Sequence, residues 1–390
     1  MRGAGAVESA PGATRSPSRT PLRLETLSSE AEFARLAGSW DDLVLAMPRP
    51  SPFLLHTWLL EWWRHYGGDG DLAVHVAYRG ERLVGALPLC IRRRYGLRVA
   101  EFVGATWAIL ADVLLASDED LSAAIALVGI AATSGHDFAD LFGLPGSSRV
   151  VAALPPETLR LVERLEAPVL DLGPGWEAVY RAKLSAKARS ERRRRMRQLA
   201  RLGSVEASVA RTPEEIAAAL EDAFRVHALR WRDRPDPTGF VTPTGLRFHR
   251  AALLRLAELD IPRITSLRVD GRPIAFALAL HLAGRAYGVN MAFDPEYARF
   301  APGFEAKLMS LESAAAEGIT RVELLGTAAP HKRRFTDRLE PVYEGIGLTR
   351  TLRGWATAGM LADGIWLRRR IKTSKTAQRL YSHVPRHARA

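Results

Sequence analysis

The residues best suited to bind a ligand gather at the start of one helical run in the second half of the chain. A β-like run, Ala286–Phe293, leads through a loop into a helical pattern over residues 304–317. Pro302-Gly303-Phe304 stands where this helix begins and where free N–H groups and the positive end of the helix dipole would lie. Such a terminus can bind phosphate, and the backbone at Gly303 and the upstream Arg299 suit that function. The alternative is a helix start without a ligand.

The elements around this helix must position it between two strands. After Gly318, which fits a C-terminal cap, a short apolar run at Val322–Leu325 is followed by a basic turn at residues 331–335. The order is strand, loop, helix and strand, with a helix long enough to cross over between parallel strands. We therefore expect a sheet with parallel strands at this point.

The first half of the chain repeats the order of units found in the second half. Capping boxes, Ser29 with Glu32 and Thr212 with Glu215, begin helices in both halves, and the hairpins at 79–89 and 270–280 correspond. The fold class predicted is α/β, an α+β mixed sheet, in two copies of one domain. We place a disordered tail at 1–21, the two domains at 22–170 and 171–355, and a basic tail at 356–390.

Composition narrows the class of protein further. The chain has 390 residues, is 47% hydrophobic and contains one cysteine, Cys90, which we expect in the core. An internal disulfide and a Cys-based zinc site are excluded, and no metal is expected. No signal-like segment and no run of about 18 apolar residues is present, which predicts a soluble cytoplasmic protein.

The net charge of +12 suits anionic partners such as phospholipid, nucleic acid or phosphorylated cofactors. Much of it lies in Arg189–Arg197, within a basic helix expected at about 176–202 after a connection at 151–175, and in Trp366–Lys372. We interpret both runs as solvated, so nucleic acid is not expected as a partner. Peripheral contact of the basic tail with an anionic membrane is the alternative.

Several segments together resemble one known family. They are the hairpin VDGRPIAFALAL, the run AFDPEYARFAPG, the ending VELLGTAAPHKRRF and, in the first half, FLLHTWLLEWWRHYG. In this order they resemble the CelD/BcsL-like acetyltransferases of the GNAT superfamily, similar in plan to the Fem peptidyltransferases with two GNAT-like domains. The resemblance covers about Leu24 to Trp355. It implies two tandem GNAT-like domains with a splayed central sheet, and acetyl-CoA or another acyl-CoA, as co-substrate, held where two parallel strands part.

The resemblance also implies where the acyl-CoA would bind. Residues 299–306 are a loose version of the family's pyrophosphate loop, with one glycine and shifted spacing. This makes Arg299, Gly303 and Phe304 candidate cofactor-binding residues, together with Asn290 on the preceding strand. In the family's last motif, Glu323, Pro330 and Lys332 match, whereas Thr327, Ala328, Ala329 and His331 replace Gly, Asp, Glu and Tyr.

Acyl transfer from a thioester to an amine needs a base and a donor that stabilises the oxyanion. Glu323 and His331 are the candidate bases, and Tyr287 or Asn290 could donate to the acyl oxygen. The alternatives are that Glu323 forms an ion pair and that Tyr287 is a core aromatic residue.

Three residues are candidates for binding the substrate. The resemblance implies that Lys332 holds a phosphate or the substrate, and that His227 and Trp231 match a His-x-x-x-Trp-like pattern. For the latter two residues, packing between helix and sheet is the favoured alternative, because they lie on an apolar helical stripe.

The sequence thus predicts an acyl-CoA-dependent acyltransferase, an N-acetyltransferase in type, acting on a sugar or small-metabolite acceptor. The resemblance links it to polysaccharide or cellulose biosynthesis. Two alternatives stay open: a Fem-like aminoacyl transferase that uses charged tRNA, and a catalytically inactive GNAT-like binding subunit.

Overall fold

The computed structural model describes residues 20–104, 110–233 and 239–373. Within these residues, thirteen strands form one mixed sheet in the order β1-β2-β3-β4-β6-β13-β7-β12-β11-β10-β9-β8, with β5 beside β3. The elements of the first half are β1 (Leu22–Leu27), α1 (Glu30–Ala34), α2 (Ala37–Leu45), η1 (Pro52–Leu54), α3 (His56–Tyr66), β2 (Asp71–Arg79), β3 (Arg82–Arg94), β4 (Leu97–Phe102), β5 (Leu114–Leu115), α4 (Leu121–Ala131), β6 (Phe138–Pro145), α5 (Arg149–Ala152) and β7 (Leu159–Asp171).

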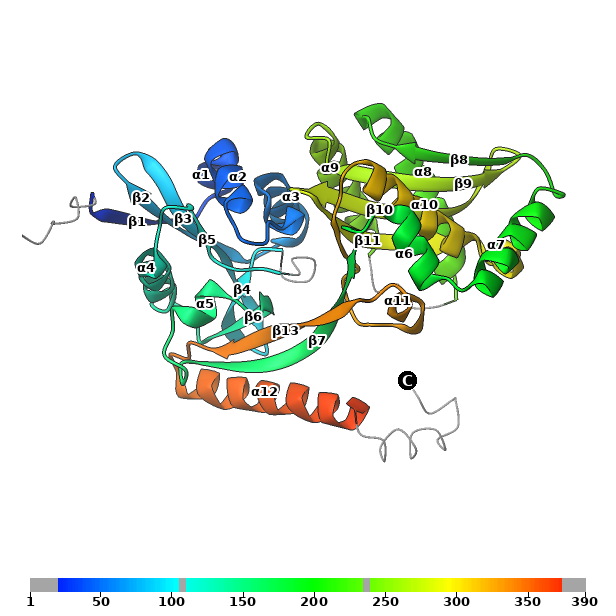
Figure 1. The fold of residues 1–390 in the computed structure, drawn as a ribbon. Helices are drawn as coiled ribbons and strands as arrows, with labels where there is room; N and C mark the ends of the chain where they lie inside the picture. Colours follow the sequence, from blue (N-terminus) through cyan, green and yellow to red (C-terminus); the bar gives the residue numbers. More distant parts are fainter. Residues whose placement is uncertain (1–19, 105–109, 234–238, 374–390) are drawn as a thin grey trace, which may run out of the picture.

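The second half carries a similar series of elements, preceded by two helices and followed by a long one. They are α6 (Trp176–Lys183), α7 (Ala186–Leu199), β8 (Val205–Ala210), α8 (Pro213–Trp231), α9 (Pro243–Ala257), β9 (Pro262–Val269), β10 (Arg272–Leu282), β11 (Arg285–Phe293), η2 (Pro295–Phe300), α10 (Pro302–Ala316), β12 (Arg321–Glu323), α11 (Pro330–Arg333), β13 (Arg338–Gly347) and α12 (Leu352–Thr373). Both predicted capping boxes form, at Ser29 and at Thr212. Each half places helices on both faces of its part of the sheet (Figure 1).

Two long strands join the halves by exchanging places. β7, the last strand of the first half, pairs with β12, whereas β13 from the second half pairs with β6. β7 and β13 also pair with each other, from Leu159 opposite Gly347 to Val169 opposite Arg338. They cross the middle of the molecule as one curved ribbon, above α12 (Figure 1).

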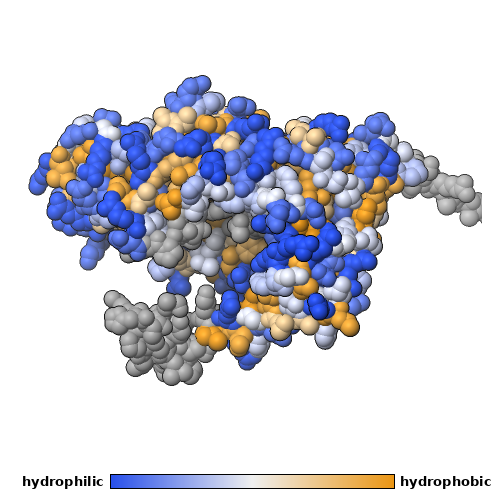
Figure 2. All heavy atoms as spheres, turned by 180° about the vertical axis from the view of Figure 1, so that it is seen from behind, coloured by the Kyte–Doolittle hydropathy of each residue, from blue (hydrophilic) through white to orange (hydrophobic). Residues whose placement is uncertain are grey.

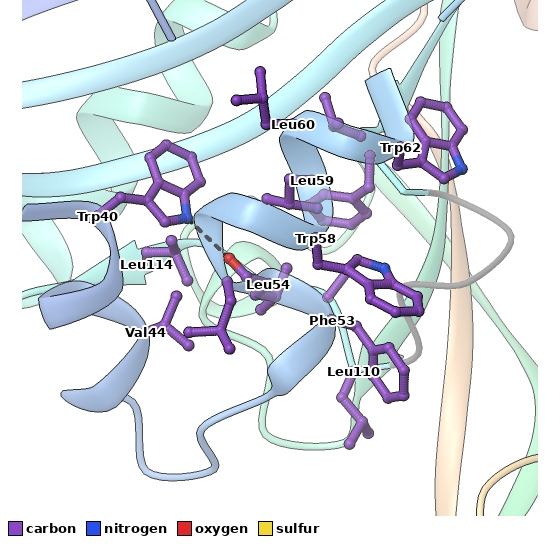
Figure 3. Packing of buried hydrophobic residues seen from close by; sticks show 14 of the residues in the cluster. Trp40, Val44, Phe53, Leu54, Trp58, Leu59, Leu60, Trp62, Leu110 and Leu114 are labelled. Atoms are coloured by element: carbon purple, nitrogen blue, oxygen red, sulfur yellow. Dashed lines mark hydrogen bonds between the residues drawn. The ribbon is translucent and has the colours of Figure 1, made fainter. Parts of the chain in front are cut away.

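An aromatic core packs the helices of the first half and continues into the second. Trp40, Trp58 and Trp62 are buried, and the indole N–H of Trp40 donates to the carbonyl of Leu54 at 2.9 Å (Figure 3). The Trp58 ring meets Phe248 of α9 edge to face, with 5.0 Å between ring centroids. Such pairs add stability beyond the area they bury, so α3 and α9 hold the two halves together. Cys90 is buried, as expected.

Three expected segments differ from the structure. The basic helix expected over 176–202 is two helices, because Ser185 caps α7 by accepting from the amide of Ala188. The expected connection at 151–175 contains the strand β7. The expected basic tail contains most of α12, whose small residues Ala358 and Ala362 pack on the sheet. The tails at 1–19 and 374–390 lie outside the described residues.

Candidate active site between diverging strands

The parallel strands β11 and β12 pair over only three residues and then part. Arg285, Ala286 and Tyr287 lie opposite Arg321, Val322 and Glu323. Just beyond this point the register of β11 against β10 shifts, so that Val289 is the extra residue of a β-bulge. The bulge bends β11, and a cleft of about 520 Å³ opens between it and residues 324–332.

The cleft has largely apolar walls and two basic side chains. Among the described residues that line it, none is acidic; they are Trp231, Ala277, Leu278, Ala279, Ala286, Gly288, Val289, Asn290, Met291, Lys307, Ser310, Leu311, Ala314, Val322, Leu324, Thr327, Ala329 and Lys332. Lys307, Ser310, Leu311 and Ala314 come from one face of α10. Cations in an apolar cleft without acidic neighbours on its wall favour an anionic ligand.

Lys307 is the functional candidate that sequence reasoning missed. Its side chain is buried, and its ammonium lies 4.5 Å from the ring centroid of Phe335. Burial, together with the charge of Lys332, lowers the pKa of Lys307 to about 8. A signal was present in the sequence, since Lys307 shares a helical stripe with Leu311 and Ala314.

Lys332 reaches the same cleft from α11. Its ammonium donates to the carbonyl of Leu325 at 2.7 Å, and burial lowers its pKa. Leu325 and Gly326 both have positive φ, 51° and 54°, which turns the chain sharply after β12. This turn brings α11 back over the cleft.

The start of α10 is built differently from the expected phosphate site. Gly303 is buried, and a Cβ there would come within 2.9 Å of the Phe293 ring, so the glycine lets α10 pack closely on β11. The guanidinium carbon of Arg299 lies over the Phe300 ring, 4.6 Å from its centroid. Phe304 lines a separate hollow of about 370 Å³ between α7 and α10.

This hollow carries charges of both signs. Arg192 of α7 donates from Nε to the Glu305 carboxylate at 2.7 Å, and Arg195 and Arg334 also line the hollow. The Glu305 carboxylate therefore occupies the first turn of α10, where a phosphate was expected. The cofactor-binding functions of Arg299, Gly303 and Phe304 stay predictions.

Glu323 and Tyr287 lie on the opposite face of the sheet from the cleft, because side chains alternate along a strand and Ala286, Val322 and Leu324 face it. The Glu323 side chain is 1% exposed and accepts from Nε of Arg321 at 2.6 Å and Nε of Arg49 at 3.1 Å. The Tyr287 hydroxyl donates to the carbonyl of Pro50, and burial raises its pKa. Both side chains therefore have structural partners from the first half, and their catalytic functions stay predictions.

The remaining candidates divide between the cleft and the core. Asn290 and Trp231 line the cleft, whereas His227 is fully buried, stacked on Trp231 at 5.8 Å between ring centroids. His331 lies in α11, but its side chain is outside the described part of the structure. Thus Asn290, Lys332 and Trp231 come together with Lys307 at one site. In the described ranges, no group of three or more His, Cys, Asp or Glu side chains could hold a metal ion.

Comparison with known proteins supports an acyltransferase fold. Residues 186–333 match the family described as "Acetyltransferase (GNAT) domain", and this range contains every residue that lines the cleft. The chain matches no curated protein sequence.

Solved structures with a similar fold cover both halves. FemX is 12% identical, with a TM-score of 0.55 over 82% of this chain and 96% of FemX. The C-terminal domain of a putative lysylphosphatidylglycerol synthetase from Agrobacterium fabrum is 15% identical, with a TM-score of 0.53 over 85% of this chain and 95% of that domain. A tandem GNAT protein from the clavulanic acid biosynthesis pathway is 16% identical, with a TM-score of 0.46 over 85% of this chain and all of that protein.

The predicted mixed α/β fold of the GNAT type is confirmed, and the match supports the prediction of an acyltransferase. The narrower likeness to CelD/BcsL-like acetyltransferases stays a prediction, as do the domain boundaries. Among the described helices, none combines the length and apolar character needed to cross a membrane.

Proposed function

We propose that this protein transfers an acyl group from an acyl-CoA to an amine or hydroxyl of a sugar or small-metabolite acceptor. The observation that carries the proposal is the cleft between β11 and β12, with Lys307 and Lys332 in its wall. β12 pairs with β11 only over Arg285–Tyr287, so an extended ligand can lie along β11 in the cleft beyond Tyr287. The arm of CoA is extended and amide-bearing, and its far end is anionic.

The chemistry follows from this arrangement. The acceptor nitrogen or oxygen attacks the thioester carbonyl, loses a proton to a base, and the C–S bond breaks to release the CoA thiolate. In this proposal the lysines hold negative charge on the donor or on the oxyanion, and Asn290 donates to the acyl oxygen. His331 is the proposed base, because it precedes Lys332 in α11.

Ligand-induced stabilisation tests the proposal, with acetyl-CoA, a long-chain acyl-CoA and free CoA as probes. A ligand present at 100 times its dissociation constant stabilises the folded state by about 2.7 kcal/mol. Gly288→Leu would fill the cleft, since a Cβ at Gly288 meets only a carbonyl at 3.8 Å. We expect the wild type to show the shift and Gly288→Leu to lose it.

Gly129→Leu is the matched control, because a side chain there enters open space on α4. It should keep the full shift. Absence of a shift in the wild type, or an equal shift in Gly288→Leu, would contradict an acyl-CoA in this cleft. The acceptor is then sought by a turnover screen that begins with amino sugars, as the link to polysaccharide synthesis suggests.

A second candidate is a Fem-like aminoacyl transferase that takes its acyl group from charged tRNA. The basic helix α7 favours it, although Arg194 and Arg195 pair with Glu191 on the same helix at 2.8 and 2.9 Å. Binding of charged tRNA with a steep salt dependence would support this candidate. The third candidate, an inactive binding subunit, is favoured by Thr327-Ala328-Ala329 in place of the family's acidic stretch. It predicts saturable CoA binding without turnover of any acceptor.

A further inference from the structure

The helix α12 exposes six large apolar side chains, while its small residues, together with Leu361 and Ile365, pack on the sheet. Its inner face, with Gly354, Ala358 and Ala362, packs on the sheet, and a Cβ at Gly354 would come within 2.2 Å of the Asp137 carbonyl. Six large apolar side chains form its outer face: Leu352 (87% exposed), Trp355 (69%), Met360 (68%), Trp366 (47%), Leu367 (52%) and Ile371 (45%). A helix whose only partner was this sheet would gain nothing from exposing them.

This outer face is where exposed apolar side chains concentrate in the described part of the molecule. Of the fifteen large apolar side chains that are exposed there, these six lie within the 22 residues of α12. The helix runs along one edge of the molecule, and apolar side chains gather at that lower edge in the opposite view (Figures 1 and 2). The face is thus placed to meet a partner.

The charges on α12 indicate which kind of partner fits. Arg353, Arg368 and Arg370 are exposed beside the outer face, and the Arg370 guanidinium lies 4.9 Å from the Trp366 ring centroid. The acidic residue among the described α12 residues, Asp363, pairs with Arg160 at 2.7 Å. A symmetric dimer across this face would bring the arginines of both copies together, which disfavours a second copy as the partner.

We propose that the outer face of α12 lies on an anionic phospholipid surface. Tryptophan and arginine are suited to the boundary between headgroups and acyl chains, where a ring or an aliphatic stem is buried and a polar tip stays wet. Apolar burial and attraction to anionic lipid add together for such a helix. The inner face stays on the sheet, so the whole protein is held at the surface by one rigid element.

Flotation of the full chain with vesicles tests the proposal. We expect the wild type to bind vesicles of phosphatidylcholine and phosphatidylglycerol and to bind pure phosphatidylcholine far more weakly. The double variant Trp355→Ser/Trp366→Ser should weaken binding by at least about tenfold. Arg353→Gln/Arg368→Gln should weaken it by a similar factor and flatten its salt dependence.

Leu45→Ser/Leu259→Ser is the matched control, because those side chains are 50% and 52% exposed away from α12. It should bind like the wild type, and all variants should unfold at the wild-type midpoint. Failure of the wild type to bind anionic vesicles would overturn the proposal, as would equal binding by the tryptophan variant. Sedimentation equilibrium would assign the face to a second copy instead, if the wild type were a dimer and Trp355→Ser/Trp366→Ser a monomer. None of these measurements depends on acyl-CoA binding.

Discussion

Each half of the molecule contains two parallel strands that pair briefly and then part, but the chain continues differently beyond the two gaps. In the first half, Val99 and Ala100 of β4 lie opposite Phe138 and Ala139 of β6, and a hollow of about 490 Å³ lies beside the point where these strands part. β5 takes the place beside β3 that a longer β4 would occupy. In the second half β11 runs on past its bulge and leaves the cleft that holds Lys307 and Lys332.

Asp112 connects the segment before β5 to the residues that follow β6. Its buried carboxylate accepts from the Ser148 hydroxyl at 2.9 Å and from the amides of Arg149 and Val150 at 2.8 and 3.0 Å. These donors follow β6, so Asp112 ties the segment before β5 to the far side of the gap. Diverging strands therefore lie beside a hollow in each half, and the side chains that line the two hollows decide what each can bind.

The two gaps also differ in charge. Beside the gap of the first half lie three acidic residues, Glu101, Asp140 and Glu344, and four arginines, Arg92, Arg93, Arg94 and Arg164. The described wall of the cleft in the second half carries lysines and no acid. The cations of the first half therefore have acidic neighbours, and those on the wall of the second-half cleft do not. Four substitutions, taken from the largest expected effect to the smallest, test this difference between the halves.

The largest effect is expected from Asp112→Ala, which removes the carboxylate that connects the segment before β5 to the residues after β6. The change leaves buried donors without an acceptor, each at a cost of about 1–3 kcal/mol, so the free energy of unfolding should fall by about 3–4 kcal/mol. Urea denaturation measures it. Asp69→Ala, at an exposed position, is the control and should change little. A loss below about 1 kcal/mol would show that Asp112 does not hold the segment before β5 to the residues after β6.

Glu323→Gln tests the carboxylate at the point where the strands of the second half part. The variant removes the more deeply buried of the two carboxylates that Arg49 and Arg321 share, and Glu340 remains as their partner, so the loss should be about 2–3 kcal/mol of unfolding free energy. Acyl-CoA affinity of the folded protein should stay unchanged. Glu312→Gln, on the exposed side of α10, is the control. Unchanged stability with lost turnover would instead make Glu323 the catalytic base.

Local signals in the sequence predicted local structure well. The capping boxes at Ser29 and Thr212 and the cap at Gly318 formed because each depends on residues within one turn. β7 was missed because it is stabilised by pairing with β13, far along the chain, and its charged residues mask the strand pattern. No local pattern shows that two halves exchange their last strands.

The candidate site could be predicted in part for the same reason. Asn290 and Lys332 were found because each lies beside a recognisable strand or turn. Lys307 was missed because lysines on helices are mostly solvated, and only the packing of α10 on the sheet buries this one. That Glu323 is paired with Arg49 could not be predicted locally, because Arg49 is a residue of the other half.

Lys307→Met tests whether the positive charge of the second-half cleft is needed to bind acyl-CoA. We expect acyl-CoA affinity to fall at least about tenfold, or roughly 1.4 kcal/mol, while stability is kept or raised, because burying an ammonium is costly. Wild-type affinity should also fall as the pH rises through about 8, where Lys307 loses its proton, and the variant should not show this step. Calorimetric titration measures both. The control is Lys187→Met, at an exposed position on α7, which should behave like the wild type. If the fall in affinity near pH 8 persisted in Lys307→Met, the deprotonation of Lys307 could not be its cause.

The smallest expected effect on stability concerns Glu344, which lies beside the gap between β4 and β6. Burial, followed by the charge of Asp140, raises the pKa of Glu344 from 4.5 to about 7. The folded state therefore holds a proton that the unfolded chain releases above pH 4.5. The resulting stability is fully present below about pH 4.5 and is lost as the pH rises through about 7.

Glu344→Gln keeps the shape of the protonated side chain and cannot lose its proton. Its unfolding free energy should match that of the wild type at pH 5 and exceed it at pH 8.5 by on the order of 1 kcal/mol, a value discounted for partial solvent screening. Urea titrations across this range measure the difference, with the exposed Glu157→Gln as control. Parallel pH curves for wild type and Glu344→Gln would show that Glu344 does not take up a proton in the folded state. Its ion pair with Arg164 would then keep Glu344 ionised, and the charge contrast with the lysine-lined cleft would be larger still.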